Sequence, residues 1–338
     1  MARRCEILLE YQNVIESPPV QPDRLYGQAC SNDAGTVDSW RQTWIDQFKE
    51  NHKTYGPFKD RSIGKFFKWS EYKPMIVAGA GPSLKVNVDK LKDRKGIGLI
   101  SCLHNFHFFE DNQVYPDFYV TLDSGPITIE EVYEGGKEPP DYYWEKTKNH
   151  KLFAYTASHP ELLKKWQGEI YFFSAPVPDA LVTDETHGKT EPFFMNISSG
   201  GNVLGASMYI AKGVLGANPV AFVGADFSFS YEKRFHPFDS KYDKNLGMVL
   251  KAVDVYGNKV LTWQSYYNFK CWFDYASIKL PGTYFNCTEG GILGAYAEGN
   301  ISTIRMIDLV DFINMYTLHH QLKSQCTNPE IVDKRILI

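Results

Sequence analysis

The chain has 338 residues, a length that suits one large domain with appended segments or two modest domains. Apolar residues make up 43% and charged residues 22%, a composition typical of globular proteins with a sizeable core. The formal net charge of -4 gives no electrostatic reason to expect nucleic acid as a partner. No run of about 18 apolar residues occurs, so no membrane span is expected.

The six cysteines stand far apart in the sequence, and no Cys-x-x-Cys pair occurs. This spacing argues against a zinc site and against a disulfide framework. The first residues are basic but are not followed by an apolar run of signal-peptide length. These features predict a cytoplasmic protein and leave its oligomeric state open.

Residues 1–70 are predicted to be an N-terminal appendage with one helix. Prolines and glycines punctuate this segment, and the helix is expected over residues 39–52. Trp40, Trp44 and Phe48 recur at i, i+4 and i+8, which places them on one helical face. We expect this face to pack against the main domain.

From Met75 onward, short apolar runs alternate with helical stretches. Near-continuous apolar character is typical of strands buried on both faces of a parallel sheet. Six strands are predicted, over residues 75–79, 97–102, 118–123, 152–156, 170–174 and 220–226. With helices expected over 87–95 and 202–215, they predict an α/β fold with a doubly wound, mostly parallel, Rossmann-like sheet over residues 71–301.

The remainder of the chain has a different pattern. Residues 253–263 predict a hairpin that turns at Gly257-Asn258, and a helix is expected over 264–275. A C-terminal helix is predicted over 302–321, within a final segment of residues 302–338. The spacing of its apolar residues predicts a buried face. That face comprises Met306, Leu309, Val310 and Ile313.

The first predicted strand leads directly into the loop Gly79-Ala80-Gly81-Pro82-Ser83-Leu84 and then into a helix. Glycines allow a sharp turn and close approach of a ligand, and the start of a helix offers free N–H groups to an anion. Ser83 is a candidate N-cap, and its hydroxyl is equally a candidate phosphate ligand. We therefore predict nucleotide binding on Gly79, Gly81, Pro82, Ser83 and Leu84.

Two better-known phosphate motifs are excluded. The dinucleotide fingerprint requires a third glycine where this chain has Leu84, and an acidic residue after the second strand, which is absent. The P-loop requires Gly-Lys followed by Ser or Thr, which Leu84-Lys85-Val86 does not supply. Binding of NAD and Walker-type binding of ATP are both disfavoured.

Polar residues follow several predicted strands, and the carboxyl ends of parallel strands form the binding crevice of such a sheet. Asn105 is a candidate contact for a base or ribose, and Asp123 for a hydroxyl or a metal ion. A capping or turn role is the alternative for both. His104 and His107 are three residues apart without an evident third ligand, so no metal centre is expected there.

A second glycine-rich segment, residues 196–202, precedes a helix of small residues. Ser199, Gly200 and Asn202 lie near the start of that helix, where an anion or carboxylate is stabilised, although small residues also permit close packing. Asp226 ends the sixth strand, and His236 lies on the loop beyond it. A histidine in this place is a candidate general base.

Three separated segments resemble the motility accessory factor and MptE-like proteins. They are residues 78–84, residues 199–229 with Gly224-Ala225-Asp226, and residues 286–291 with Thr288-Glu289-Gly290-Gly291. The resemblance covers residues 75–301, and the Thr-Glu-Gly-Gly segment is its most specific part. The first two segments, with Asn105, are also similar to bacterial CMP-sialic-acid-dependent sialyltransferases.

The resemblance implies a transferase. Motility accessory factors are thought to transfer nonulosonic acids from a CMP donor to flagellin hydroxyls. MptE enzymes transfer diphosphate from ATP to a hydroxymethyl pterin and use magnesium. Residues 1–70 match neither group, and the long flanking regions of motility accessory factors are missing, so flagellin is not the expected acceptor.

From this resemblance we predict a glycosyltransferase with a nucleotide-activated sugar donor, expected to be a CMP-linked nonulosonic acid used without a metal. The acceptor would be a hydroxyl of a glycan, a protein or a small molecule. The expected catalytic residues are His236, which would deprotonate that hydroxyl, Asp226 and Glu289. Asn105 would hold the nucleotide, Ser199 and Gly200 the charged group of the donor, and Thr288 would add a further contact.

Two alternatives remain. In an MptE-like diphosphokinase, Asp123 and Asp226 would hold magnesium against ATP. In a non-catalytic ligand-binding protein, the same fold would bind without turnover.

Overall fold

A computed structural model describes residues 22–175, 195–229, 236–238, 249–294 and 303–326, and the two-residue strand β1 (Ile15–Glu16). Its centre is an eight-stranded sheet in the order β11-β10-β7-β2-β3-β4-β5-β6. Every neighbouring pair in this sheet is parallel. The predicted α/β fold with a doubly wound, parallel sheet is confirmed.

All six predicted strands are present, with ends that differ by up to three residues. They are β2 (Met75–Ala78), β3 (Gly98–Cys102), β4 (Phe118–Thr121), β5 (Lys151–Tyr155), β6 (Glu169–Phe173) and β7 (Val220–Val223). Two further strands, β10 (Tyr284–Asn286) and β11 (Arg305–Met306), extend the sheet beyond β7. Sequence analysis missed these two because three and two residues are too few to show a period.

The chain reverses its direction of winding between β2 and β7. From β2 it proceeds through β3, β4, β5 and β6 to one edge, and β7 then returns to pair with the other side of β2. Such a switch point opens a crevice outside the carboxyl ends of the two strands. The glycine loop after β2 and the Gly-Ala-Asp segment after β7 therefore meet there.

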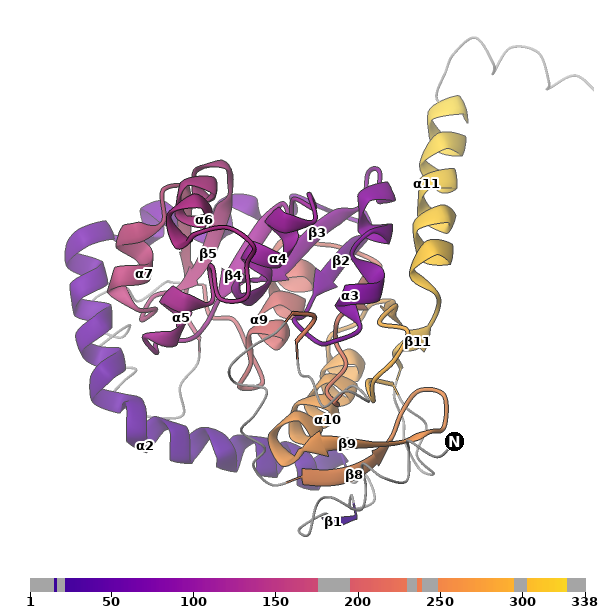
Figure 1. Cartoon of the computed structure of the whole chain (residues 1–338), viewed down its shortest axis with the longest axis horizontal. Helices are drawn as coiled ribbons and strands as arrows, with labels where there is room; N and C mark the ends of the chain where they lie inside the picture. Colours follow the sequence, from indigo (N-terminus) through magenta and orange to yellow (C-terminus); the bar gives the residue numbers. More distant parts are fainter. Residues whose placement is uncertain are drawn as a thin grey trace, which may run out of the picture.

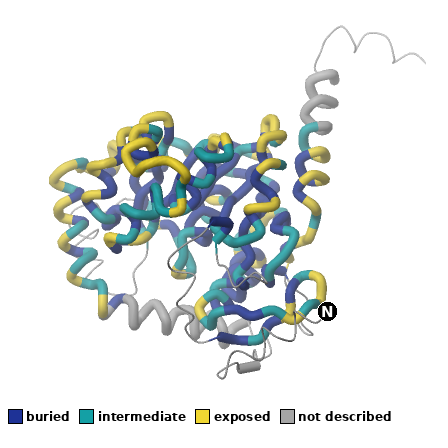
Figure 2. The backbone as a smooth tube through the Cα atoms, in the orientation of Figure 1, coloured by how far each residue is buried: buried dark blue, intermediate teal, exposed yellow. Residues whose placement is uncertain are grey.

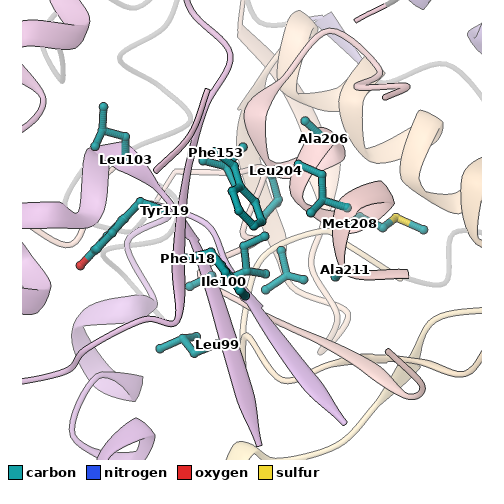
Figure 3. Close-up of a cluster of buried hydrophobic side chains, with 14 of the residues drawn as sticks. Leu99, Ile100, Leu103, Phe118, Tyr119, Phe153, Leu204, Ala206, Met208 and Ala211 are labelled. Carbon is teal, nitrogen blue, oxygen red and sulfur yellow. The ribbon is translucent and has the colours of Figure 1, made fainter. Parts of the chain in front are cut away.

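Helices cover both faces of the sheet (Figure 1). On one face, α9 (Val203–Tyr209) continues into a π-helical turn (Ile210–Val214) and packs over β2, β3 and β4. Figure 3 shows Leu204 and Met208 of this helix beside Ile100 and Phe118 of the sheet. Figure 2 shows the sheet as the buried centre of the molecule.

Short helices connect the other strands (Figure 1). They are α3 (Leu84–Asn87), α4 (Phe106–Asp111), α5 (Ile127–Glu130), α6 (Pro140–Lys146) and α7 (Pro160–Lys165). The helix predicted over 87–95 was wrong in its position, because α3 ends at Asn87 and is followed by a 3-10 turn (Lys90–Asp93). The predicted hairpin is confirmed as β8 (Val249–Val253) and β9 (Lys259–Trp263), and α10 (Gln264–Lys279) follows it.

The N-terminal helix α2 (Pro22–Tyr55) is far longer than the predicted helix over 39–52. Figure 1 shows it running down one flank of the sheet and then beneath the sheet to α10. The glycines that predicted a loop before Ser39 lie within this helix, since helix propensity is a weak signal that packing overrides. The packing partner here is α10.

The C-terminal helix α11 (Leu309–Cys326) begins later than predicted, because the residues before it form β11. Leu309 and Ile313 are buried as expected, and Phe312 joins them. Met306 and Val310 were wrongly predicted to be buried, since they are 36% and 46% exposed. Among the helices of the described residues, none combines the length and apolar character needed to cross a membrane.

Candidate functional site

A cavity of about 510 Å³ lies over the switch point, at the carboxyl edge of the sheet. It brings together many of the residues that the sequence singled out. Its lining includes Gly79, Gly81, Pro82, Asp123, Ser199, Asn202, Asp226 and His236. The other candidates, Ser83, Leu84, Asn105, Gly200, Thr288 and Glu289, do not line it, and their contacts show what they do instead.

The glycine loop is packed against the end of β7. The amide of Gly79 donates to Val223 O (2.9 Å), and the amide of Gly81 donates to Gly224 O (2.8 Å). A Cβ at Gly79 would lie 2.5 Å from Gly224 O, and one at Gly81 would overlap the Asp226 carboxylate. These glycines are therefore required for the approach of two backbone segments, in addition to any approach of a ligand.

Asp226 joins the two sides of the switch point. Ser83 Oγ donates to its Oδ2 (2.8 Å), and Ser83 N lies 3.3 Å from its Oδ1. Burial raises the pKa of the Asp226 carboxyl to about 7, against the hydrogen bonds from Ser83, which lower it. Ser83 thus stands at the N-cap position of α3, as predicted, but its hydroxyl donates to this carboxylate and makes no capping hydrogen bond.

Asn105 is fully buried behind the glycine loop. Its Nδ2 donates to Gly79 O (2.9 Å) and to Ser101 Oγ (3.1 Å). The side chain therefore fixes the loop from below, and the base or ribose contact expected from the sequence has no support in its position. Leu84 is likewise buried in the core.

In the segment before α9, some residues line the cavity and others hold the local structure in place. Asn202 is the N-cap, and its Oδ1 accepts from Gly205 N (2.8 Å). Gly200 has φ +59°, and a Cβ there would overlap the Trp272 ring. Gly200 is therefore a packing residue, whereas Ser199, Gly201 and Asn202 face the cavity.

Two histidines share one wall of the cavity. The ring centroids of His104 and His236 are 4.5 Å apart, and Phe238 stacks on His236 at 5.3 Å. Burial lowers the pKa of His104 well below its ordinary value, and the neighbouring His236 and His107 lower it further. His104 is therefore neutral at pH 7, which leaves His236 as the candidate base on this wall.

Two other acidic residues of the cavity lining, Asp123 and Glu131, flank α5. Asp123 Oδ1 accepts from Gly125 N (2.7 Å), which is a turn contact that leaves its second oxygen available. Burial raises the pKa of Glu131 to about 8, and the carboxylates of Asp123 and Glu134 contribute in the same direction. Sequence analysis missed Glu131, which stands in a helical stretch with no local motif.

Apolar side chains from two helices that are far apart in the sequence complete the lining, and most of them are aromatic. Val37, Trp40 and Trp44 come from α2, and Tyr266 and Phe269 come from α10. The predicted packing of this face on the main domain is confirmed for Phe48 and Trp44, and Trp40 and Trp44 in addition line the cavity. The predicted appendage therefore forms part of the cavity wall.

The segment 286–291 lies at the same edge of the sheet, immediately behind the cavity. Thr288 Oγ1 accepts from Ala225 N (3.1 Å), and a Cβ at Gly291 would overlap the backbone of Asp226. Glu289 pairs with Lys90 Nζ (2.5 Å) and accepts from Leu309 N (2.9 Å). These contacts make the segment a support of the site.

The lining is rich in carboxyl groups and poor in cations. In the described part of the chain, no Lys or Arg lines the cavity. Across the same residues, no group of three or more His, Cys, Asp or Glu side chains is arranged to hold a metal ion.

Comparison with known proteins addresses the family and the fold. Residues 42–232, more than half of the chain, match the family described as 6-hydroxymethylpterin diphosphokinase MptE-like. The chain belongs to this MptE-like family. Its resemblance to that family, stated above from the sequence, is confirmed.

A solved structure with a similar fold is the MAf glycosyltransferase from Magnetospirillum magneticum AMB-1. The two share 12% sequence identity with a TM-score of 0.54, over 90% of this chain and 51% of that one. The MptE-like chain thus spans about half the length of this neighbour, and the similarity concerns the fold. A comparison with curated proteins gave no match.

Proposed function

We propose that this MptE-like protein is a glycosyltransferase that takes a nucleotide-activated sugar, with a CMP-linked nonulosonic acid as its expected donor. The observation that carries the proposal is the cavity at the switch point, where the glycine loop, the Asp226 carboxyl and a pair of histidines meet. The fold shared with the MAf glycosyltransferase supports it.

Charge favours a donor with a single phosphate. A triphosphate brings about four negative charges, and the described lining offers carboxyl groups and no Lys or Arg to balance them. A CMP-linked nonulosonic acid brings about two negative charges, one on its single phosphate and one on its sugar carboxylate. Asp226, with a pKa of about 7, accepts a proton readily and then donates a hydrogen bond to that phosphate.

The reaction would be a direct substitution at the anomeric carbon. The acceptor oxygen forms the new glycosidic bond while the bond from the anomeric carbon to the phosphate oxygen breaks, and the nucleotide leaves. His236 takes the proton of the acceptor hydroxyl, and the neutral His104 ring beside it excludes water. Asp226 stabilises the charge that develops on the leaving phosphate.

A diphosphokinase is the second candidate, because the matched family carries that description. Asp123 and Asp226 both line the cavity and are carboxylates of the kind that hold magnesium, but they follow β4 and β7, which are three strand spacings apart, so they would hold separate ions. In that function magnesium would supply the positive charge that the described lining lacks.

Titration calorimetry separates these functions. The glycosyltransferase predicts that CMP binds without magnesium, and that CMP-linked nonulosonic acid releases CMP when an acceptor is added. Binding of ATP only with magnesium, and no binding of CMP, would transfer the assignment to the diphosphokinase. Nucleotide binding without turnover of either donor would indicate a ligand-binding protein.

A further inference from the structure

The aromatic face of α2 is held in place by polar contacts with the sheet. Gln47 Nε2 donates to Ser124 O (3.0 Å), and Asn51 Nδ2 donates to Thr156 O (3.0 Å) and Ser158 O (2.8 Å). Asn51 is fully buried, so these bonds are protected from water. The helix is thus fixed to the loops after β4 and β5, and the side chains one and two turns earlier are held over the cavity.

Those earlier side chains are Trp40 and Trp44, which stand at i and i+4 on one face. Both are partly exposed and line the cavity, and Trp44 also packs against the main core. A Cβ built on Gly125 would lie 3.4 Å from the Trp40 ring and 3.2 Å from Asp123 Oδ1. The indole of Trp40 and the carboxylate of Asp123 therefore border the same small residue.

A further polar group faces this part of the cavity. Tyr155, at the end of β5, lines the cavity and is only 3% exposed. Its hydroxyl has no hydrogen-bond partner among the described residues. Buried hydroxyls are normally satisfied, so a ligand hydroxyl in the cavity is a natural partner.

This aromatic and polar wall is separate from the expected donor phosphate. The glycine loop follows β2, His104 follows β3, and Asp123 follows β4. Neighbouring strands are about 4.8 Å apart, so the wall lies about 10 Å from the loop. His104 and its neighbour His236 stand between them.

We propose that the face of α2 formed by Trp40 and Trp44 is the acceptor subsite, and that the acceptor is a saccharide whose ring stacks on these indoles. The proposal rests on the proposed function for its donor side. A sugar ring presents C–H groups on one face and hydroxyls at its edge. The indoles match the first, and Asp123, Glu131 and Tyr155 match the second.

A protein acceptor is the competing occupant. A Ser or Thr in a peptide has a single hydroxyl on a short side chain and uses neither a flat aromatic surface nor several hydroxyl partners. The subsite also lies inside a cavity of about 510 Å³, a size that suits a small molecule or one or two sugar rings.

The test measures binding by saturation-transfer NMR, with and without CMP. The ligands are maltose, lactose, N,N′-diacetylchitobiose and a Ser/Thr-containing peptide. The wild type should bind at least one saccharide. Replacing Trp40→Ala and Trp44→Ala together should weaken that binding at least tenfold, and replacing both by Phe should restore most of it. CMP affinity should not change in either double variant.

Trp69→Ala is the matched control, because Trp69 is 44% exposed and contacts Gly98 at the amino end of β3, away from the cavity. It should bind saccharide as the wild type does. Binding of the peptide but of no saccharide would overturn the proposal, as would unchanged saccharide affinity in the double Ala variant. Failure of CMP to bind the wild type would count against the proposed donor instead, and the saccharide titrations without CMP would still decide the subsite.

Discussion

The helix α2 and the segment 286–291 reach the carboxyl edge of the sheet from opposite ends of the chain. α2 places Trp40 and Trp44 in the lining of the cavity. The segment 286–291 places no side chain there, and its hydrogen bonds go to Ala225, Asn87 and the start of α11. The first region thus forms a surface for a ligand, and the second holds the Gly-Ala-Asp turn that carries Asp226.

This difference shows that a distinctive motif and a ligand contact are separate properties. The second glycine of the Thr-Glu-Gly-Gly segment is explained by the backbone of Asp226, which a Cβ at Gly291 would overlap, whereas a Cβ at Gly290 would meet only Asp226 Oδ1, at 4.0 Å. The tryptophans of α2 keep a partly exposed surface in the cavity lining, although Trp44 also packs against the main core. Substitutions of residues that line the cavity should therefore lower activity. Substitutions of the supporting residues in segment 286–291 should lower stability.

The largest effect is expected for His236→Ala. Removal of the base should lower turnover by two or more orders of magnitude, roughly the contribution of general base catalysis. Nucleotide affinity should stay unchanged, because the imidazole would contact the acceptor hydroxyl. Steady-state kinetics with a CMP-linked donor measures turnover, and calorimetry measures nucleotide affinity.

His159→Ala is a suitable control for this loss, since His159 caps α7 and does not line the cavity. Turnover near that of the wild type in the His236 variant would remove this residue from the mechanism.

The next effect is a pH dependence caused by Asp226. Because burial raises its pKa to about 7, the carboxyl is protonated below that pH and negatively charged above it. Phosphate affinity should therefore fall as the pH rises through 7, by up to about tenfold per pH unit. Calorimetry with CMP from pH 6 to 8 should show this trend in the wild type and lose it in Asp226→Asn.

Stability should follow the same direction. The folded pKa of Asp226 is above its unfolded value, so its contribution is fully present below pH 4 and is lost as the pH rises through 7. The free energy of unfolding of the wild type should thus fall relative to that of Asp226→Asn as the pH rises from 4 to 8. The wild type should fall relative to Glu131→Gln in the same way over a window that ends higher, near pH 8, because both losses begin near the unfolded pKa of about 4 and end at the folded one. Identical pH profiles for the wild type and Asp226→Asn would refute the shift.

Sequence reasoning identified the parts of the fold that are set by local pattern. Six buried strands, the hairpin and the helix after it were found from their apolar runs and turn residues. The glycine loop, Asp226 and His236 were found because they follow strands whose carboxyl ends must share one edge. The strands β10 and β11 were missed because their short runs are defined only by their partners.

The rest of the site depends on long-range packing. The exposure of Trp40 and Trp44 is set by the side-chain bonds of Gln47 and Asn51 to loops about 80 and 105 residues away, which no local pattern reports. For Glu289 the local pattern was misleading. Its acidic side chain and neighbouring glycines indicated a catalytic role that its pairing with Lys90 does not support. The sequence shows which residue types are present, but it does not show which distant residues they contact.

A moderate effect is expected at the boundary of the two regions, for Gly81→Ala. The added Cβ would overlap the Asp226 carboxylate and lie 2.6 Å from Gly224 O, so the loop has to shift. The free energy of unfolding should fall by about 1–3 kcal/mol, and nucleotide affinity should fall with it. Thermal unfolding with and without CMP measures both.

Gly213→Ala is the matched control, because nothing lies within 4 Å of a Cβ at that position. This variant should keep or slightly raise stability, since alanine is the better helix former. A Gly81→Ala protein with the stability and nucleotide affinity of the wild type would show that the loop is looser than its contacts indicate.

The smallest effect, and the sharpest test of the comparison, is expected for Glu289→Gln. The change keeps the shape of the side chain and removes the charge that pairs with Lys90, whose side chain is 27% exposed against 20% for Glu289. Partial exposure screens such a pair, so stability should fall by only about 1 kcal/mol. Lys90→Gln should cost a similar amount, and the double variant little more than either alone, because the two changes break one interaction. Turnover and nucleotide affinity should remain those of the wild type in all three proteins, since neither side chain lines the cavity. A tenfold loss of turnover in a fully folded Glu289→Gln protein would instead place this carboxylate in the chemistry, and the segment 286–291 would then belong with α2 among the regions that meet the ligand.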